Sequence, residues 1–415
     1  MKRHIIRQML NEWRENIWLL LGLIIVCTAV AVLALTLWVE NKGWFEPKGF
    51  NPENVLVADM SVIDSTSRQY VNLGEKGIQA DMRNHKAIVE RIRQSPNVEK
   101  VGYGINALPY TMNFYGVGLF RADIAKDTLL VMGNLRQVSP EVAEVLELQS
   151  VTGKSPRELA DLLSNDMLLI GQPLGEKYES YADVTEHQLS FTFDSISRFK
   201  VGDRINIIKR SEFESSEMAG TIVKRFDERG GDGLFETLMI RTKPGCADKF
   251  REEFAKTADM RHIGNSVARN LKSLDSMATI VNAEQLASIR LSLLIVIVFI
   301  ALIILGLMGT FWFRVQQRSG EIALRKICGA TSGDIFRRII GEAMILLAVA
   351  VAVAFGLLYL ITEKVIETEE PVSVSLMAVV TLVTGLLVAA GIVLSIWYPA
   401  YRAMHIEPAL AVKVE

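Results

Sequence analysis

Four long uncharged blocks constrain this 415-residue chain more than any other feature. A helix needs roughly 20 apolar residues to cross the hydrocarbon core of a bilayer, which is about 30 Å thick. Helices buried in soluble proteins rarely lack charge on every face over such a length. The sequence therefore predicts four transmembrane helices, at residues 17–39, 291–313, 343–362 and 373–398. The first is expected to be an uncleaved anchor, because its apolar run is longer than that of a signal peptide.

Lysine and arginine residues predict the orientation of these helices, since short cytoplasmic segments are enriched in them. The segment 1–16 contains four and the loop 314–342 contains six, whereas the loop 363–372 has one lysine against four glutamates. We therefore expect an amphipathic cytoplasmic N-terminal segment, a cytoplasmic loop 314–342 and a cytoplasmic tail 399–415. The short loop 363–372 and the residues after the first span are expected outside.

Residues 40–267 are numerous enough to fold as a separate domain. Runs typical of strands and segments with helical periodicity alternate along them, which predicts a mixed α/β fold. We expect two subdomains, about 45–135 with 235–267, and 136–234. Apolar residues at helical spacing predict a stalk helix at 268–290, although the same stretch could instead pack on the domain. The expected fold class is a membrane protein with four transmembrane α-helices and a large mixed α/β extracytoplasmic domain inserted between helices 1 and 2.

Motifs for common enzyme chemistry are absent from the sequence. It has no G-x-x-x-x-G-K-[ST] nucleotide-binding loop, no H-E-x-x-H, no C-x-x-C and no G-x-S-x-G. The five histidines are scattered and each is expected at the surface, and three cysteines are too few for a disulfide framework. A net charge of −2 excludes a strongly basic nucleic-acid binder. We therefore predict no catalytic residue, no metal site and no nucleic-acid partner.

The loop 314–342 has the most specific local pattern in the chain. Glu321–Ile327 predicts a two-turn helix, in which Glu321 and Arg325 form a favourable i,i+4 pair. Gly329 suits the position after the helix, and Thr331-x-x-Asp334 resembles a capping box. From the residues alone, both a protein-docking element and an ordinary helix on lipid headgroups remain open.

Two cytoplasmic motifs carry a resemblance to a known family. The run Arg318–Thr331 resembles the signature that follows the second span of FtsX-like permease domains, and Tyr398–Ala411 is similar to their closing motif, with departures at Tyr401 and at Leu410-Ala411. The outer domain resembles the MacB-type periplasmic core at three segments: Pro96–Val101, Leu168–Lys177, and Phe199–Asp203 followed by Gly220–Val223. The chain thus resembles MacB/FtsX-like ABC transporter permeases over nearly its whole length.

The resemblance implies a non-catalytic permease subunit in the inner membrane of a bacterial cell. It implies a homodimer or heterodimer served by an ABC ATPase subunit, with a periplasmic adaptor or outer-membrane channel and membrane lipid as further partners. The chain itself would bind no cofactor, since ATP and Mg are used by the partner ATPase. The residues expected to dock the ATPase are Glu321, Ile322, Leu324, Arg325, Lys326, Gly329 and Ala330, and Glu342 matches a family glutamate at the inner border of the third span.

Three functions follow as hypotheses. The first is mechanotransmission, in which ATP hydrolysis by the partner moves the extracytoplasmic domain to export peptides, toxins or lipid-type cargo. The second is an FtsX-type signalling subunit that activates a cell-wall hydrolase. The third is a membrane-anchored receptor or scaffold without any ATPase. The large outer domain favours the first over the second, and the docking signature favours both over the third.

Overall fold

The computed structural model of the chain describes residues 13–72, 77–121, 129–171, 188–191, 197–215, 220–228, 233–317, 320, 322, 324, 327–364 and 372–404. These residues belong to two compact units. We call Met1–Glu40 with Leu286–Glu415 the helical unit, and Asn41–Gln285 the sheet unit. Most of the predicted N-terminal segment, the centre of the loop 363–372, the end of the tail and the motif residues 172–177 lie outside the described residues.

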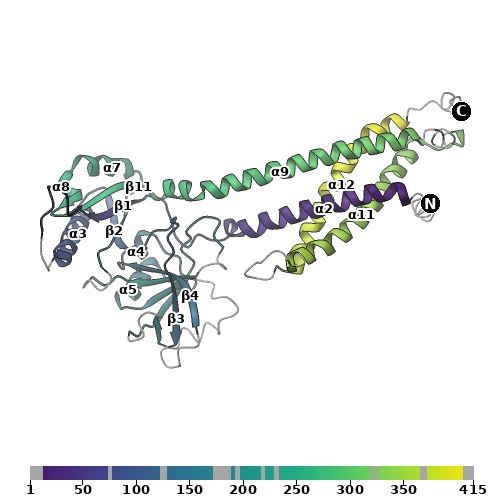
Figure 1. Ribbon diagram of the computed structural model, residues 1–415. Helices are drawn as coiled ribbons and strands as arrows, with labels where there is room; N and C mark the ends of the chain where they lie inside the picture. The colour runs from purple at the N-terminus through teal and green to yellow at the C-terminus, as the bar shows by residue number, and fades with distance from the viewer. Residues whose placement is uncertain are drawn as a thin grey trace. The chain divides into compact units, whose positions relative to one another are not determined.

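Four helices in the described part of the chain are long and apolar enough to cross a membrane. They are α2 Trp13–Asn41, α9 Leu274–Gln317, α11 Ser332–Lys364 and α12 Val374–Met404 (Figure 1). Small side chains line the contact of α2, α11 and α12, among them Cys27, Ala31, Ala350 and Ala354. Small residues allow helix backbones to approach closely, which is how helices associate in lipid. The predicted combination of four apolar helices and a mixed α/β domain is confirmed.

The sheet unit contains one mixed sheet in its described residues. Its strand order is β10-β11-β1-β9-β2-β4-β8-β5-β7, and β3 pairs with both β4 and β6. The pairs β4–β8 and β5–β7 are parallel and the others are antiparallel. The strands are β1 Val55–Val62, β2 Val98–Ile105, β3 Gly116–Arg121, β4 Leu129–Val138, β5 Leu168–Gly171, β6 Leu189–Phe191, β7 Val201–Ile205, β8 Gly220–Arg225, β9 Thr237–Thr242, β10 His262–Ile263 and β11 Ser266–Ser273.

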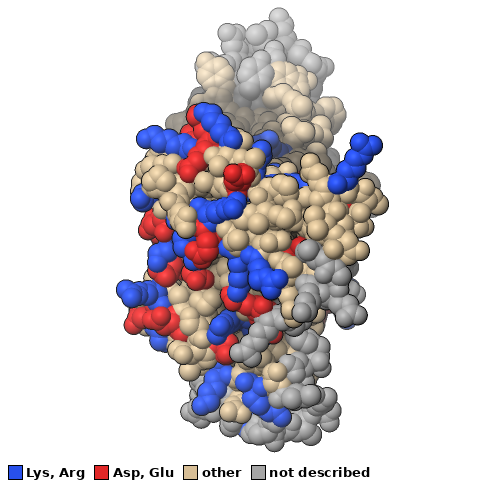
Figure 2. All heavy atoms as spheres, turned by 90° about the vertical axis from the view of Figure 1, so that its left-hand side faces the viewer, with Lys and Arg blue, Asp and Glu red and all other residues tan. Residues whose placement is uncertain are grey.

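Short helices cover parts of this sheet. They are α3 Gly77–Arg93, α4 Val142–Val145, α5 Pro156–Ser164, α7 Ala247–Lys256 and α8 Ala258–Arg261. On α3, the side chains of Met82, Ile88, Val89 and Ile92 are buried at helical spacing, so one face of the helix packs on the sheet. Basic and acidic side chains are interspersed on the face of the sheet unit that Figure 2 shows, which leaves no extended field of one sign there.

Two expectations for the sheet unit need comment. Residues 268–273 belong to strand β11, whereas a stalk helix was expected from residue 268, because this segment pairs with β1 far back in the sequence. Strand β3, expected in the first subdomain, pairs with β6 of the second, so one sheet runs through both predicted subdomains.

His85 is buried in the α3–sheet contact, where a surface histidine was expected. Its Nδ1 lies 3.0 Å from the carbonyl oxygen of Asp81 and 2.7 Å from the Ser266 hydroxyl. Because a carbonyl oxygen only accepts, the contact with Asp81 requires a proton on Nδ1. Burial lowers the pKa of His85 to about 4, against a weaker opposing effect of the hydrogen bond to Asp81. The ring is therefore neutral at pH 7.

This histidine predicts a loss of stability on acidification. Its pKa is 6.5 when unfolded and about 4 when folded, so between these values the unfolded chain binds a proton that the folded chain does not. The free energy of unfolding should fall by about 3 kcal/mol from pH 7 to pH 4 through this group alone. Pulse proteolysis of the full chain across a urea gradient at each pH measures this loss.

The variant His85→Gln should be less stable at pH 7 but should lose less stability on acidification. The matched control is His262→Gln, because His262 is exposed and its removal should leave the wild-type pH dependence intact. An unchanged pH dependence in His85→Gln would contradict the assignment.

One loop of the sheet unit contacts the C-terminal end of α2 and the beginning of α9. The Lys209 ammonium is buried and donates to the carbonyl oxygens of Gly43 and Glu46, the latter at 3.1 Å. Trp44, in the short 3-10 helix η1 Lys42–Phe45, stacks on Phe213 with 5.1 Å between ring centroids. We call residues 41–49, 206–215 and 282–285 the helix junction.

The two helix ends also meet within the helix junction. The Gln285 side-chain amide donates to the Asn41 side-chain oxygen at 3.0 Å, and the Glu212 backbone N–H donates to the Asn282 side-chain oxygen at 3.0 Å. Residues 274–281 of α9 pack against the core of the sheet unit through Leu274, Met277 and Val281. This part of the expected stalk therefore lies on the domain.

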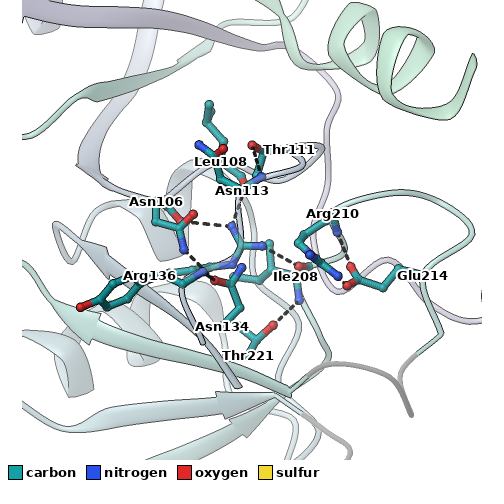
Figure 3. Close-up of polar contacts among 11 residues, drawn as sticks. Asn106, Leu108, Thr111, Asn113, Asn134, Arg136, Ile208, Arg210, Glu214 and Thr221 are labelled. Atoms are coloured by element: carbon teal, nitrogen blue, oxygen red, sulfur yellow. Dashed lines mark hydrogen bonds and ion pairs between the residues drawn. The ribbon is translucent and has the colours of Figure 1, made fainter. Parts of the chain in front are cut away.

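A buried arginine joins the helix junction to a second loop, residues 106–115 (Figure 3). The guanidinium of Arg136 on β4 donates to the carbonyl oxygens of Leu108 at 2.5 Å, Asn106 at 3.3 Å and Ile208 at 2.9 Å. Burial lowers the pKa of Arg136 to about 10, so the side chain remains charged at neutral pH. One side chain thus fixes the backbone of both loops.

Candidate functional site

The predicted helix in the loop between α9 and α11 is present at every described position. Residues 320, 322, 324 and 327 are helical, and the Cys328 backbone N–H donates to the Leu324 carbonyl at 3.0 Å. Gly329 follows with a φ of 92°, in the left-handed region where a Cβ is unfavourable. The helix therefore ends at the glycine, as its sequence predicts.

A capping box begins α11 immediately afterwards. The Asp334 backbone N–H donates to the Thr331 hydroxyl at 3.3 Å. In return, the Thr331 backbone N–H and hydroxyl donate to the Asp334 carboxylate at 3.1 and 2.6 Å. The predicted capping box is confirmed, and it leaves only a tight turn between the loop helix and α11.

The apolar residues of the loop helix divide between two environments. Ile322 is only 8% exposed and packs against Ile335 and Ile339 of α11. Leu324 and Ile327, by contrast, are 61% and 59% exposed. Residues three positions apart in a helix lie on the same side, so Leu324 and Ile327 form one exposed apolar pair. The helix is thus anchored on one side and available for contact on another.

The other predicted site residues are distributed as follows. Glu321, Arg325 and Lys326 lie outside the described residues. Gly329 and Ala330 form the turn after the helix. Glu342 is mostly buried on α11 and forms an i,i+4 ion pair with Arg338 at 3.4 Å. This contact orients Glu342 along its own helix, which fits a structural role at the border of the span.

Ile327 was absent from the predicted docking residues, although it is nearly as exposed as Leu324. The i,i+3 spacing of the two residues in the sequence could have indicated a shared face. For metal binding, the described ranges contain no group of three or more histidine, cysteine, aspartate or glutamate side chains placed to hold an ion. The chemistry available at the loop is therefore that of apolar contact and charge pairing.

Comparisons with known proteins identify the segment that contains this loop. Residues 293–408 match the family model described as FtsX-like permease C-terminal. A search of curated proteins gives no match. Among solved structures, the periplasmic region of MacB from Actinobacillus actinomycetemcomitans matches with 10% identity and a TM-score of 0.32, covering 58% of this chain and 98% of that one.

A second solved structure is the extracellular domain of the noncanonic ABC-type transporter YknZ from Gram-positive bacteria. It matches with 9% identity and a TM-score of 0.29, covering 52% of this chain and all of that one. The matched segment 293–408 includes the whole of the first motif, Arg318–Thr331, and residues 398–408 of the closing motif. The match of residues 293–408 to the FtsX-like permease C-terminal model agrees with the predicted resemblance to FtsX-like permeases in this segment of the chain.

Proposed function

We propose that the chain is the permease subunit of a MacB/FtsX-type ABC transporter, in which a separate ATPase moves the extracytoplasmic domain. The observation that carries this proposal is the loop helix between α9 and α11. It is fixed on α11 through Ile322 and presents Leu324 and Ile327 to a partner. An exposed apolar pair beside basic residues is a suitable contact for a soluble motor protein.

The tight connection to α11 supports mechanical coupling in particular. A flexible tether would transmit no displacement, but this helix is joined to α11 by a capped turn and by buried isoleucines. A partner that pulls on the loop helix would therefore displace α11. The proposed direction of coupling is from ATP hydrolysis in the cytoplasm to the sheet unit outside.

The remaining features of the proposal follow the family. The working unit is a dimer with an identical or related second permease, served by an ABC ATPase that binds ATP and Mg. Both termini lie in the cytoplasm and the sheet unit lies beyond the inner membrane of a bacterial cell. Peptides, toxins or lipid-type molecules are the cargo, passed to an envelope adaptor or outer-membrane channel.

Charge reversal at the loop tests this function. The double variant Arg325→Glu, Lys326→Glu is expected to insert into the membrane normally but to lose stimulation of the partner ATPase. Like charges or lost pairs at a contact weaken association by several kcal/mol. The measurement is ATP hydrolysis by the ATPase that co-purifies with the full chain in nanodiscs, alongside the amount of ATPase retained.

Two further variants make this test specific. Lys364→Glu reverses one charge at the other end of α11 and should leave ATPase stimulation unchanged. Leu324→Ser, Ile327→Ser should reproduce the loss, since these side chains are exposed and their removal leaves the core intact. Normal stimulation in both loop variants would refute docking. A co-purifying cell-wall hydrolase would select the signalling function, and consistent absence of an ATPase would select a scaffold.

A further inference from the structure

The position of the helix junction relative to the bilayer follows from two independent chain paths. The uncharged block of α2 ends at Val39, two residues before Asn41. The uncharged block of α9 begins at Leu291, six residues after Gln285. A helix rises about 1.5 Å per residue, so both apolar blocks end within roughly 10 Å of the hydrogen bond between Asn41 and Gln285. If α2 and α9 cross the membrane, the helix junction lies at its outer surface.

The loop 106–115 is attached directly to this junction. The Tyr110 backbone N–H donates to the Lys209 carbonyl at 3.3 Å, and the Tyr110 hydroxyl donates to Glu212 at 3.1 Å. The guanidinium carbon of Arg210 lies 4.9 Å from the centre of the Phe114 ring. Since Lys209 also binds the carbonyls of Gly43 and Glu46, the loop is held beside the segment that leaves α2.

These two segments carry large apolar side chains that are exposed. Met112 and Phe45 are 78% and 74% exposed, and Trp44, Phe114 and Tyr115 are each about half exposed. We call these five residues the apolar rim. Exposure of these apolar side chains to water is unfavourable. Aromatic rings that carry a polar atom are enriched where the hydrocarbon core of a membrane meets the lipid headgroups.

Two cations near the apolar rim form ion pairs with carboxylates. Lys48 pairs with Glu212 at 2.6 Å, and Arg210 pairs with Glu214 at 2.7 Å. Each of these two pairs is neutral, so neither cation is left to attract an anionic ligand. This combination fits the neutral interfacial zone of a phospholipid bilayer, where apolar side chains enter and paired charges stay in the headgroup layer.

We propose that the apolar rim rests in the outer leaflet and makes lipid the second support of the sheet unit, beside its covalent links to α2 and α9. Membrane contact at the rim depends on the two helices being spans and not on any ATPase. The proposed membrane contact could therefore be disproved while the proposed transport function holds. The transport function could likewise be disproved while the membrane contact holds. Rim residues would sense lipid directly, and displacement of the helix junction would move them in or out of the leaflet.

A fluorescent label on the rim tests this contact in the full chain. Met112→Cys is prepared with Cys246→Ser and Cys328→Ser, and Cys27 is retained because it is fully buried. In nanodiscs of zwitterionic phosphatidylcholine, an environment-sensitive label at this position should emit at shorter wavelength than in water. Lipids that carry a nitroxide near the headgroup should quench it more strongly than lipids labelled deep in the acyl chain. Adding anionic lipid should leave the quenching unchanged.

The matched control is Ile78→Cys on α3, which is 61% exposed in the same unit. Figure 1 draws α3 well apart from the segment that follows α2. A label there should emit as in water and escape quenching. Equal behaviour of the two labels would overturn the proposal. So would a blue-shifted but unquenched label at residue 112, because it would show that protein covers the rim, and so would quenching that appears only with anionic lipid.

Discussion

The variant Gly49→Ala is expected to lower the free energy of unfolding of the sheet unit by about 3 kcal/mol. Gly49 has a φ of 73°, a conformation that costs a residue with a Cβ about 1 kcal/mol. A Cβ at this position would also lie 2.2 Å from the carbonyl oxygen of Ile207 and 2.9 Å from that of Asn206. Both atoms belong to the backbone, so the loop itself must shift, which adds roughly 1–3 kcal/mol.

The control Gly153→Ala separates these two contributions. Gly153 has a φ of 88°, so an alanine there would have the same conformational cost as at Gly49. No atom lies within 4 Å of the position that its Cβ would take, so the substitution causes no steric overlap. Its expected loss is about 1 kcal/mol. Pulse proteolysis of the full chain across a urea gradient compares the variants. Equal losses in Gly49→Ala and Gly153→Ala would show that the chain does not pack closely against residues 206–207.

Replacing Arg136 by methionine is the second large expected effect. Three carbonyl oxygens, of Asn106, Leu108 and Ile208, would lose their donor while remaining buried or partly buried. An unsatisfied buried group costs about 1–3 kcal/mol, and removal of a buried charge offsets part of the sum. We expect a net loss of about 3 kcal/mol, together with faster hydrogen exchange in the loop 106–115 and near Ile208.

The variant Arg136→Lys serves as the comparison. A lysine keeps the charge, but its compact ammonium cannot donate to three separated carbonyls as the planar guanidinium does. Its stability should therefore lie between those of the wild type and Arg136→Met. Wild-type exchange in the loop 106–115 in Arg136→Met would contradict the assignment of this arginine as the joint between the two loops.

The helical unit could be predicted well because its determinants are local. A span requires only an uncharged run of sufficient length, and the blocks at 291–313 and 343–362 fall within α9 and α11. The end of the loop helix at Gly329 and the capping box at Thr331 depend on neighbouring residues alone. The same local pattern, Ser155-x-x-Glu158, forms a capping box before α5.

The sheet unit was less predictable because its determinants are distant in sequence. Apolar spacing in 268–273 suits a helix, but pairing with β1 makes the segment a strand. Nothing adjacent to His85 in sequence indicates that Ser266 and Phe235 enclose it. The exposure of Leu324 and Ile327 also depends on a tertiary contact, namely which isoleucine of the loop helix packs against α11. The structure shows that this isoleucine is Ile322.

The pairing of β1 has a consequence for biogenesis. Val55 and Leu56, near the start of the sheet unit, pair with Arg241 and Ile240 on one side, and Leu56 pairs with Ser273 on the other. Strand β1 is therefore synthesised well before its partners β9 and β11. Contacts so far apart in sequence form slowly. Until these partners are made, the two unpaired edges of β1 can pair with the wrong strands. Newly made chains should need a holding chaperone on the sheet unit until translation of α9 has begun.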